Sequence, residues 1–334
     1  MKRILITGIA GLLGTNLSKY LLDKGYDVYG IDDLSGGYIE NIDERILNSN
    51  KFYKMNLVDV EKLNDFFLRN DIDIVYHFAA YAALGLSPFI RNFNYTNNII
   101  CSVNVINCCI NYNVEKLIFS SSMDVYGDNI VPFNEEQIPL PLDPYGISKY
   151  AVELDLKNAY EQFGLKYNII RPHNVLGIYQ NIWDKYRNVI GIWIRQSIND
   201  EPLTIYGDGL QKRAFSDIKY YMEPFEKLIK GFDNELFNIG ADKEFTILET
   251  AQMVKEVAKE FGYNTSITFL EERDEVKEAY CNHDKAKKLL NFEDNTDLKS
   301  LISDMYKWTI TQPNREVKLM EYEIDKNIYS YWKK

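Results

Sequence analysis

The sequence predicts an α/β protein with a doubly wound, mainly parallel sheet of seven strands, helices on both faces, and a smaller α/β lobe. Short β-branched segments alternate with helix-like segments over roughly the first half of the chain. A glycine-rich turn joins the first strand to a helix, and an acidic pair ends the second strand. From about residue 181 the alternation stops and a segment rich in aromatic and basic residues begins. That change marks the start of the lobe.

The individual elements follow from hydrophobic periodicity and from the positions of glycine and proline. We expect strands at about 3–7, 26–31, 52–56, within 72–80, at 116–120, within 164–171 and at 236–240, with a further short strand at 202–207. We expect helices at about 15–24, 60–70, 98–113, 145–163 and 246–261. A proline-rich connector at 132–144 leads into the helix at 145–163.

Composition excludes several classes of protein. The chain has 334 residues, of which 46% are hydrophobic and 26% charged, as in an ordinary globular protein with a substantial core. Its net charge of −11 argues against nucleic acid or an anionic membrane surface as the main partner. An anionic ligand would need basic groups placed locally around it.

Cysteine and histidine usage points to a reduced compartment and to no metal centre. The four cysteines show no C-x-x-C spacing, so we expect free thiols in a cytoplasmic protein. His77, His173 and His283 lie far apart and lack metal-ligand spacing. We find neither a signal peptide nor an apolar run long enough to cross a membrane.

The glycine-rich turn has the chemistry of a phosphate site. Gly8, Gly11 and Gly14 follow the first strand and open the first helix. Backbone N–H groups and the helix dipole at such a position attract an anion, and glycines let the backbone approach it closely. Asp32 and Asp33 end the second strand, 18 residues after Gly14. An acid there binds ribose hydroxyls and repels a 2′-phosphate, which favours NAD over NADP.

Tyr145 and Lys149 are spaced to share one face of a helix. A free tyrosine, with a pKa near ~10, is a poor base at neutral pH. An adjacent ammonium favours the phenolate and lowers that pKa. The pair is therefore suited to removing a proton from a hydroxyl group, although two ordinary helix residues would show the same spacing.

The G-x-x-G-x-x-G spacing, together with Tyr-x-x-x-Lys far downstream, resembles the short-chain dehydrogenase/reductase superfamily. The length points to its extended branch, the NAD-dependent nucleotide-sugar epimerases and dehydratases, and the resemblance covers nearly the whole chain. It implies a Rossmann-like fold and NAD as cofactor. The cofactor residues that it implies are Gly8, Gly11, Leu12, Leu13, Gly14, Asp32, Asp33, Asn56, Leu57, Phe78, Ala79, Ala80, Asn98, Ser120, Tyr145, Lys149 and His173.

Two positions depart from the family pattern near the cofactor. Asn56 stands where the family usually has Asp, and Ala82 stands where 4-epimerases often have lysine. The first change keeps a hydrogen-bonding group, whereas the second removes one expected cofactor contact. We expect His77, which precedes the Phe78–Ala80 stretch, to be a core residue and not a catalytic one.

The segment from Ser120 to Gly127 resembles the Ser-Ser-Ser-x-x-Val-Tyr-Gly block of the family. The resemblance gives Ser122, Tyr145 and Lys149 catalytic roles, with Ser122 bonded to the reacting hydroxyl. Dehydratases carry an acidic pair or Ser-Glu after this serine, where this chain has Met123 and Asp124. Because methionine cannot carry a proton, dehydration is disfavoured, and oxidation at one carbon with or without hydride return remains.

Further matches imply a nucleotide-diphosphate sugar as substrate. Arg213 and Arg273 match arginines that bind the diphosphate, and a guanidinium binds phosphate oxygens in a bidentate manner. Ala279 aligns with the position that gates the sugar 2-substituent, where a small residue admits an N-acetyl group; a slip onto Tyr280 would reverse this. The full set of expected substrate residues is Ser122, Asn174, Asn188, Val189, Tyr206, Arg213, Arg273 and Ala279.

The resemblance also implies an organisation and an activity. We expect an NAD-binding part at 1–177 plus about 215–247, a nucleotide-sugar lobe at about 178–214 plus 248–334, and a homodimer formed through a four-helix bundle by 98–113 and 146–163. The expected activity is NAD-dependent 4-epimerisation of UDP-glucose and UDP-galactose or their N-acetylamino forms. The alternatives are a net dehydrogenase or other-carbon epimerase on a nucleotide-activated sugar, and a non-catalytic NAD-binding scaffold.

Overall fold

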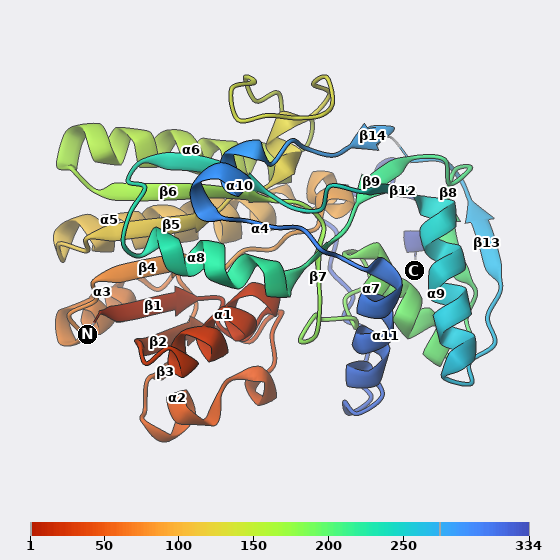
Figure 1. The fold of residues 1–334 in the computed structure, drawn as a ribbon, viewed down its shortest axis with the longest axis horizontal. Coiled ribbons are helices and arrows are strands. Elements are labelled where there is room, and N and C mark those ends of the chain that lie inside the picture. The colour runs from red at the N-terminus through yellow and green to blue at the C-terminus, as the bar shows by residue number, and fades with distance from the viewer. Residues whose placement is uncertain (1, 274, 334) are drawn as a thin grey trace.

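The centre of the molecule is a seven-stranded sheet in which every neighbouring pair is parallel (Figure 1). The computed structural model describes residues 2–273 and 275–333. The strand order is β3-β2-β1-β4-β5-β6-β11. The strands are β1 Arg3–Thr7, β2 Asp27–Asp32, β3 Phe52–Lys54, β4 Ile74–His77, β5 Lys116–Ser120, β6 Lys166–Pro172 and β11 Glu235–Ile239. The predicted fold class is confirmed.

The central strands are apolar on both faces because helices cover both sides of the sheet. Ile4 and Ile6 of β1 face a core shared with α1 (Leu12–Asp23), α8 (Met222–Leu228) and α10 (Asp284–Leu290). Leu5 points the other way, into a core shared with α3 (Val60–Arg69), α5 (Cys101–Asn111) and α6 (Pro144–Phe163). These three β1 side chains are fully buried, so the uninterrupted apolar run in the sequence corresponds to a strand between two helical layers.

One helix begins earlier than its hydrophobic pattern predicts. The expected helix at 98–113 runs from α4 (Arg91–Tyr95) through a π-helical turn at Thr96–Ile100 into α5. The Glu323 carboxylate accepts hydrogen bonds from the backbone N–H groups of Asn92 and Phe93, at 2.7 and 2.8 Å. A residue far along the chain thus provides acceptors for the free N–H groups of the first helical turn. The local sequence therefore did not reveal this earlier helix start.

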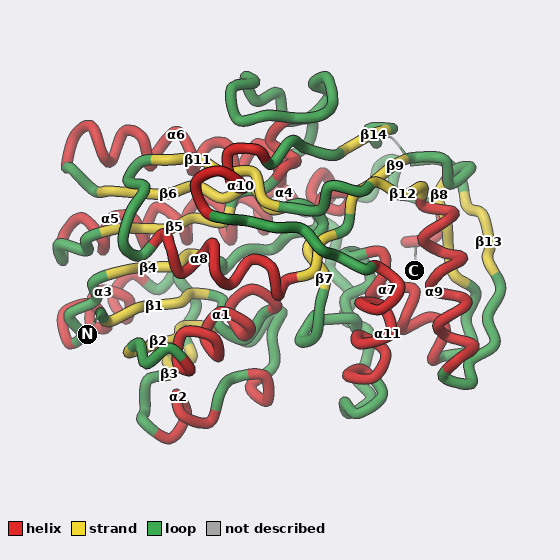
Figure 2. Tube along the Cα trace, viewed as in Figure 1, coloured by secondary structure: helices red, strands yellow, loops and turns green. Residues whose placement is uncertain are grey.

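The lobe lies beyond the carboxyl ends of the strands, on the right in Figures 1 and 2. Helices α7 (Val189–Ile198), α9 (Ile247–Glu260) and α11 (Leu298–Thr309) enclose a core that includes Trp193 and Tyr306. The remaining helix is α2 (Glu44–Asn48). The short strands are β7 Val175–Leu176, β8 Leu203–Tyr206, β9 Lys212–Ala214, β10 Ser216–Asp217, β12 Glu244–Thr246, β13 Ile267–Leu270 and β14 Glu278–Ala279.

Helix α10 affects the division into parts. It belongs in sequence to the 248–334 segment expected in the lobe, yet it packs against α8 and β11 at the sheet. We still propose an NAD-binding part at 1–177 plus about 215–247 and a lobe at about 178–214 plus 248–334. The one change is that α10 belongs to the NAD-binding part.

His77 is a buried core residue, as expected. Its Nδ1 lies 2.7 Å from Thr7 Oγ1 and its Nε2 lies 2.9 Å from Ser102 Oγ. Both ring nitrogens therefore have partners. Within the described residues, no helix combines the length and apolar character needed to cross a membrane.

Candidate active site

A large cavity, about 1710 Å³ in volume, lies where the carboxyl ends of the sheet strands meet the lobe. The strand order reverses between β1 and β4, and such a switch point leaves a crevice in a parallel sheet. Turns after β1, β2, β4 and β5 line one end, and segments of the lobe line the other. The fold therefore provides one site that can hold two ligands end to end.

The glycine turn after β1 leaves no room for a side chain at Gly8 or Gly14. Gly8 has a φ of +72°, and a Cβ there would lie 2.8 Å from the backbone nitrogen of Ala79. A Cβ on Gly14 would lie 2.3 Å from the Gly8 carbonyl oxygen. Gly11 caps the N-terminus of α1. With Leu12 and Leu13 these glycines line the cavity, which places the backbone N–H groups of a helix start at its wall.

The acidic pair after β2 lines the same end. Asp32 accepts hydrogen bonds from the backbone N–H groups of Ala10 and Leu34, at 2.9 and 2.8 Å. Burial raises the pKa of Asp32. Asp33 accepts a hydrogen bond from the Asn56 side chain at 2.9 Å. No ion pair recorded in the described part of the chain involves either carboxyl group, so their negative charge faces the cavity uncompensated by a cation.

These residues fit NAD. A glycine cradle at a helix start matches a pyrophosphate, and an uncompensated acidic pair matches ribose hydroxyls and disfavours a 2′-phosphate. The other expected cofactor residues at the cavity wall are Asn56, Leu57, Phe78, Ala79, Ala80, Ser120, Tyr145 and Lys149.

Two expected cofactor residues, Asn98 and His173, are not among the described residues that line the cavity, and their contact with the cofactor stays a prediction. Asn98 is buried, and its side chain bonds the backbone N–H and carbonyl of Tyr81, at 2.8 and 3.1 Å. His173 is also buried, with Nδ1 3.2 Å from Nε2 of His283. The protein itself occupies the Asn98 amide, whereas Nε2 of His173 is buried without a hydrogen-bond partner among the described residues.

Helix α6 supplies Tyr145 and Lys149, two of the three expected catalytic residues, to the cavity wall. Asp143 caps the helix by accepting hydrogen bonds from the N–H groups of Tyr145 and Gly146, at 2.8 and 3.1 Å. Lys149 Nζ donates to the Ser120 carbonyl at 2.8 Å and lies 5.9 Å from the centroid of the Tyr145 ring. Ser122 follows β5 directly and also lines the cavity.

The electrostatics of the pair differ from the sequence prediction. Burial lowers the pKa of Lys149 to about 7. The pKa of Tyr145 is raised, mainly by burial and then by the Asp124 charge, with a smaller opposing effect of the Ser122 hydroxyl. Burial is thus the main influence on the pKa of Tyr145, and the expected lowering by Lys149 stays a prediction.

The expected substrate residues gather at the other end of the cavity. Asn174, Asn188, Val189, Tyr206, Arg213, Arg273 and Ala279 all line it, whereas Tyr280 is not among the described lining residues. Arg213 donates to Glu275 Oε2 at 2.9 Å and to the Val276 carbonyl at 2.8 Å. This arginine therefore already has acceptors within the protein.

Arg273 lies in an aromatic cluster that includes the C-terminal tail. Its guanidinium carbon lies 3.1 Å from the centroid of Tyr206, 4.7 Å from Trp332 and 5.2 Å from Tyr329. Trp332 is buried, and its carbonyl accepts a hydrogen bond from Tyr322 at 2.9 Å. Sequence reasoning assigned no role to the tail, because its aromatic residues have no regular period.

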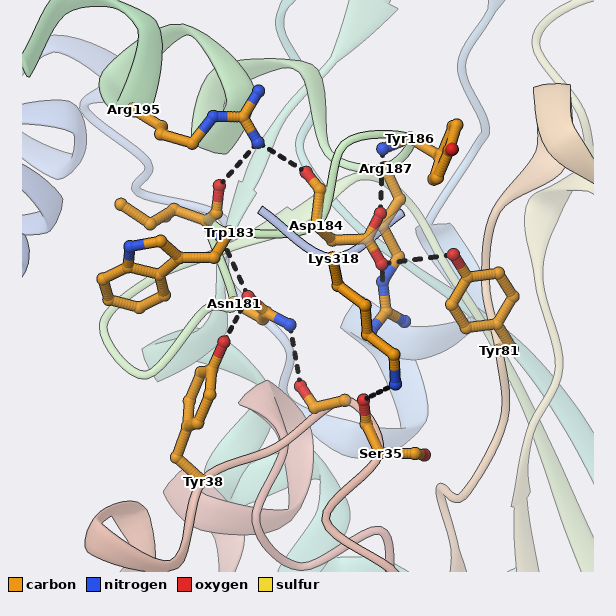
Figure 3. Close-up of polar contacts among 12 residues, drawn as sticks. Ser35, Tyr38, Tyr81, Asn181, Trp183, Asp184, Tyr186, Arg187, Arg195 and Lys318 are labelled. Carbon is orange, nitrogen blue, oxygen red and sulfur yellow. Dashed lines mark hydrogen bonds and ion pairs between the residues drawn. The ribbon is translucent and has the colours of Figure 1, made fainter. Parts of the chain in front are cut away.

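A second group that the sequence did not reveal joins the lobe to the loop after β2 (Figure 3). Asp184 accepts hydrogen bonds from Arg187 Nε at 3.0 Å and from the Tyr81 hydroxyl at 3.3 Å. Asn181 bonds the Gly36 carbonyl at 3.0 Å, and Lys318 bonds the Ser35 carbonyl at 2.9 Å. The only available signal was the run of aromatic and basic residues from 181 onward.

Comparison with known proteins identifies the family. The model of the NAD dependent epimerase/dehydratase family matches residues 4–240. The chain belongs to this family. It is an NAD-dependent enzyme of the extended short-chain dehydrogenase/reductase type, as the motifs predicted, and its cofactor is NAD.

Three solved 4-epimerases share the fold of this family member. The UDP-glucose 4-epimerase of Thermotoga maritima, with UDP-glucose, is 30% identical with a TM-score of 0.85, over 92% of this chain and 98% of its own. The UDP-N-acetylglucosamine 4-epimerase of Methanobrevibacter ruminantium, with UDP-N-acetylmuramic acid, is 31% identical with a TM-score of 0.82, over 93% and 99%. The UDP-glucuronic acid 4-epimerase of Bacillus cereus, with its substrate and NAD, is 29% identical with a TM-score of 0.81, over 92% and 98%.

Proposed function

We propose that this enzyme is a nucleotide-sugar 4-epimerase. The observation that carries the proposal is the arrangement of one cavity. Ser122, Tyr145 and Lys149 lie beside the NAD end, and Arg213 and Arg273 line the opposite end. A diphosphate held by the arginines would extend its sugar toward the hydroxyl-bearing residues. Similarity to 4-epimerases that act on three different UDP-sugars supports the same reaction class.

The residues of this chain handle the proton and hold the substrate. The glycine turn and the acidic pair would hold NAD, which when bound would supply reversible hydride transfer at the sugar carbon. Tyr145 and Ser122 exchange the proton of the C4 hydroxyl, which general acid–base catalysis requires. Lys149, with its pKa near 7, carries part of its positive charge beside the phenol at neutral pH. Met123, buried at the cavity wall, offers no proton for elimination of water.

We propose UDP-glucose and UDP-galactose or their N-acetylamino forms as substrates. Ala279 is buried and lines the cavity, while Tyr280 is absent from the described lining residues. This placement supports the proposal that Ala279, and not Tyr280, lies beside the sugar 2-substituent. A side chain as small as alanine would leave space there for an N-acetyl group.

We propose a homodimer in which α4–α5 and α6 of two subunits form a four-helix bundle. These helices expose several large apolar side chains, which a partner helix would cover. They are Ile100, Ile147, Leu154, Tyr160 and Phe163. Light scattering after size-exclusion chromatography would give twice the chain mass if this is correct, and the chain mass if it is not.

One assay tests the proposed function against its alternatives. The purified protein is mixed separately with UDP-glucose, UDP-galactose, UDP-N-acetylglucosamine and UDP-N-acetylgalactosamine, without added NAD. Proton NMR follows the sugars and near-ultraviolet absorbance follows NADH. Interconversion without accumulated NADH supports a 4-epimerase. Accumulated NADH would indicate a net dehydrogenase instead. Absence of reaction with these and with other nucleotide sugars would favour a non-catalytic scaffold.

A further inference from the structure

Asp124 holds the Ser122 hydroxyl from two sides. It lies in the 3₁₀ turn Met123–Tyr126 that directly follows Ser122, and it lines the cavity. The Ser122 hydroxyl donates to Asp124 Oδ2 at 3.1 Å. The backbone N–H of Asp124 donates to Ser122 Oγ at 3.2 Å. The orientation of the hydroxyl is therefore set by its neighbour and not by solvent.

This orientation limits what Ser122 can do for a substrate. A hydroxyl has one proton to donate and two lone pairs that accept. The proton is directed at the Asp124 carboxylate, and one lone pair accepts from the Asp124 N–H. In this orientation Ser122 offers a sugar hydroxyl its second lone pair, which can accept a hydrogen bond. With Asp124 ionised, Ser122 can accept the substrate proton by passing its own proton to Asp124, while Tyr145, which also interacts with the Ser122 hydroxyl, is the other candidate acceptor.

Titratable groups on α6, on β9 and in the segment after β14 interact with the Asp124 carboxyl. Burial raises its pKa to about 7, and the negative charge of Asp143, at the start of α6, acts in the same direction. The Ser122 hydroxyl and Arg213 of β9 oppose this rise. Asp124 in turn raises the pKa values of Tyr145 and of the Cys281 thiol, although burial is the main cause for both.

The neighbourhood suits reversible proton transfer. Asp124 lies deep in the molecule but keeps part of its surface toward the cavity. A carboxyl group with a pKa close to neutral pH can both take up and return a proton. Tyr145, whose pKa is raised by burial and by the Asp124 charge, is less often ionised while Asp124 is ionised. A second acceptor on the same serine would remove this difficulty.

We infer that Asp124 is a positioning residue and, next to Tyr145, a second acceptor for the proton of the reacting sugar hydroxyl, which it receives through Ser122 and returns in the reverse step. In the forward step the sugar O–H bond breaks and a new Ser122 O–H bond forms. At the same time the original Ser122 O–H bond breaks and a proton binds Asp124 Oδ2. The reverse step restores each bond. The electron pair of the C–H bond leaves as the hydride already described, so charge and atoms balance. This inference rests on the proposed function.

The test is the pH dependence of kcat/KM for Asp124→Asn, measured with UDP-glucose and UDP-N-acetylglucosamine. Asparagine has the same shape but cannot accept the proton. In the wild type, kcat/KM should rise with pH and level off above about 7, because the acceptor must be ionised in the free enzyme. Asp124→Asn should lower kcat/KM on the order of 10²-fold and lose this acid limb. Asp124→Glu should regain the limb and part of the activity.

Asp143→Asn provides a second variant that keeps the fold. Asparagine caps helices about as well as aspartate, so α6 should retain its start while one negative charge is removed. The acid limb should then move to lower pH. Bound NAD and the melting temperature are measured for each variant to confirm folding.

The outcomes separate this inference from the proposed function. An active wild type would overturn the inference alone if Asp124→Asn kept the acid limb or turned over at near wild-type rates. If the acid limb of the pH profile did not move in Asp143→Asn, that result would also overturn the inference alone. A wild type that transforms no nucleotide sugar would overturn both.

Discussion

The two ends of the cavity are built in different ways. At the NAD end, much of the wall consists of backbone turns that follow strands of one sheet, and Gly8 and Gly14 there admit no side chain. At the nucleotide-sugar end, side chains arrive from separate segments of the lobe and the tail, and both candidate arginines already contact protein groups. The comparison teaches that the first end is fixed by local chain geometry and the second by long-range packing.

The largest effect is expected at the junction of the two ends. Tyr145→Phe removes the phenolic hydroxyl and should lower kcat about 10³-fold, within the range for loss of a general acid–base group. The variant should keep its NAD, because the glycine cradle is untouched. Turnover is measured by NMR and NAD by absorbance after denaturation. Turnover within a few-fold of wild type would contradict the mechanism.

Gly14→Ala tests whether the NAD end depends on backbone approach. The added Cβ would lie 2.3 Å from the Gly8 carbonyl oxygen, and such overpacking costs about 1–3 kcal/mol. We expect less NAD in the purified protein and a lower melting temperature. Gly231→Ala is the matched control, because nothing lies within 4 Å of its added Cβ. Equal NAD content in the two variants would refute a tight cradle.

Arg273→Gln tests the opposite end. Loss of a hydrogen bond to a charged group costs about 1.5–3 kcal/mol, so KM for the nucleotide sugar should rise about tenfold or more. NAD content should remain at the wild-type level, because the arginine lies in the lobe. Arg69→Gln, at an exposed surface pair, serves as the control. If Arg273→Gln lowered NAD content but left KM unchanged, the two ends would not be separate.

The smallest effect should be a change in substrate preference. Ala279→Tyr would fill space at the cavity wall and should reduce kcat/KM for N-acetylated sugars about tenfold relative to plain hexoses. Tyr280→Phe is the control, because that residue is not among the described lining residues. Parallel rate measurements on both sugar pairs decide the matter. A preference altered by Tyr280→Phe and not by Ala279→Tyr would place the gate one residue later.

The contrast between the ends also explains how much could be predicted from sequence. The glycine turn, the acidic pair and the Tyr145–Lys149 spacing depend on residues close in the chain, and the structure brings all of them to one cavity. Local spacing determines such features, because a strand end or a helix turn places its own neighbours.

Long-range packing determined what the sequence could not show. The contacts of Asn98 with the Tyr81 backbone and of Arg213 with Glu275 depend on segments brought together by the fold. The rise in the pKa of Tyr145 has the same origin, since burial is a property of the assembled molecule. A pattern of residues indicates which groups are present but not which of them the protein itself will occupy.

The stacking of the tail on Arg273 has an evolutionary consequence. The family match spans residues 4–240, whereas Arg273 and the tail residues Tyr329 and Trp332 lie beyond it. Since we propose that Arg273 binds the nucleotide diphosphate, mutations there would alter that binding without touching the residues that handle the proton. Lineages could thus acquire new sugar donors by drift in their final sixty or so residues while inheriting the chemistry unchanged.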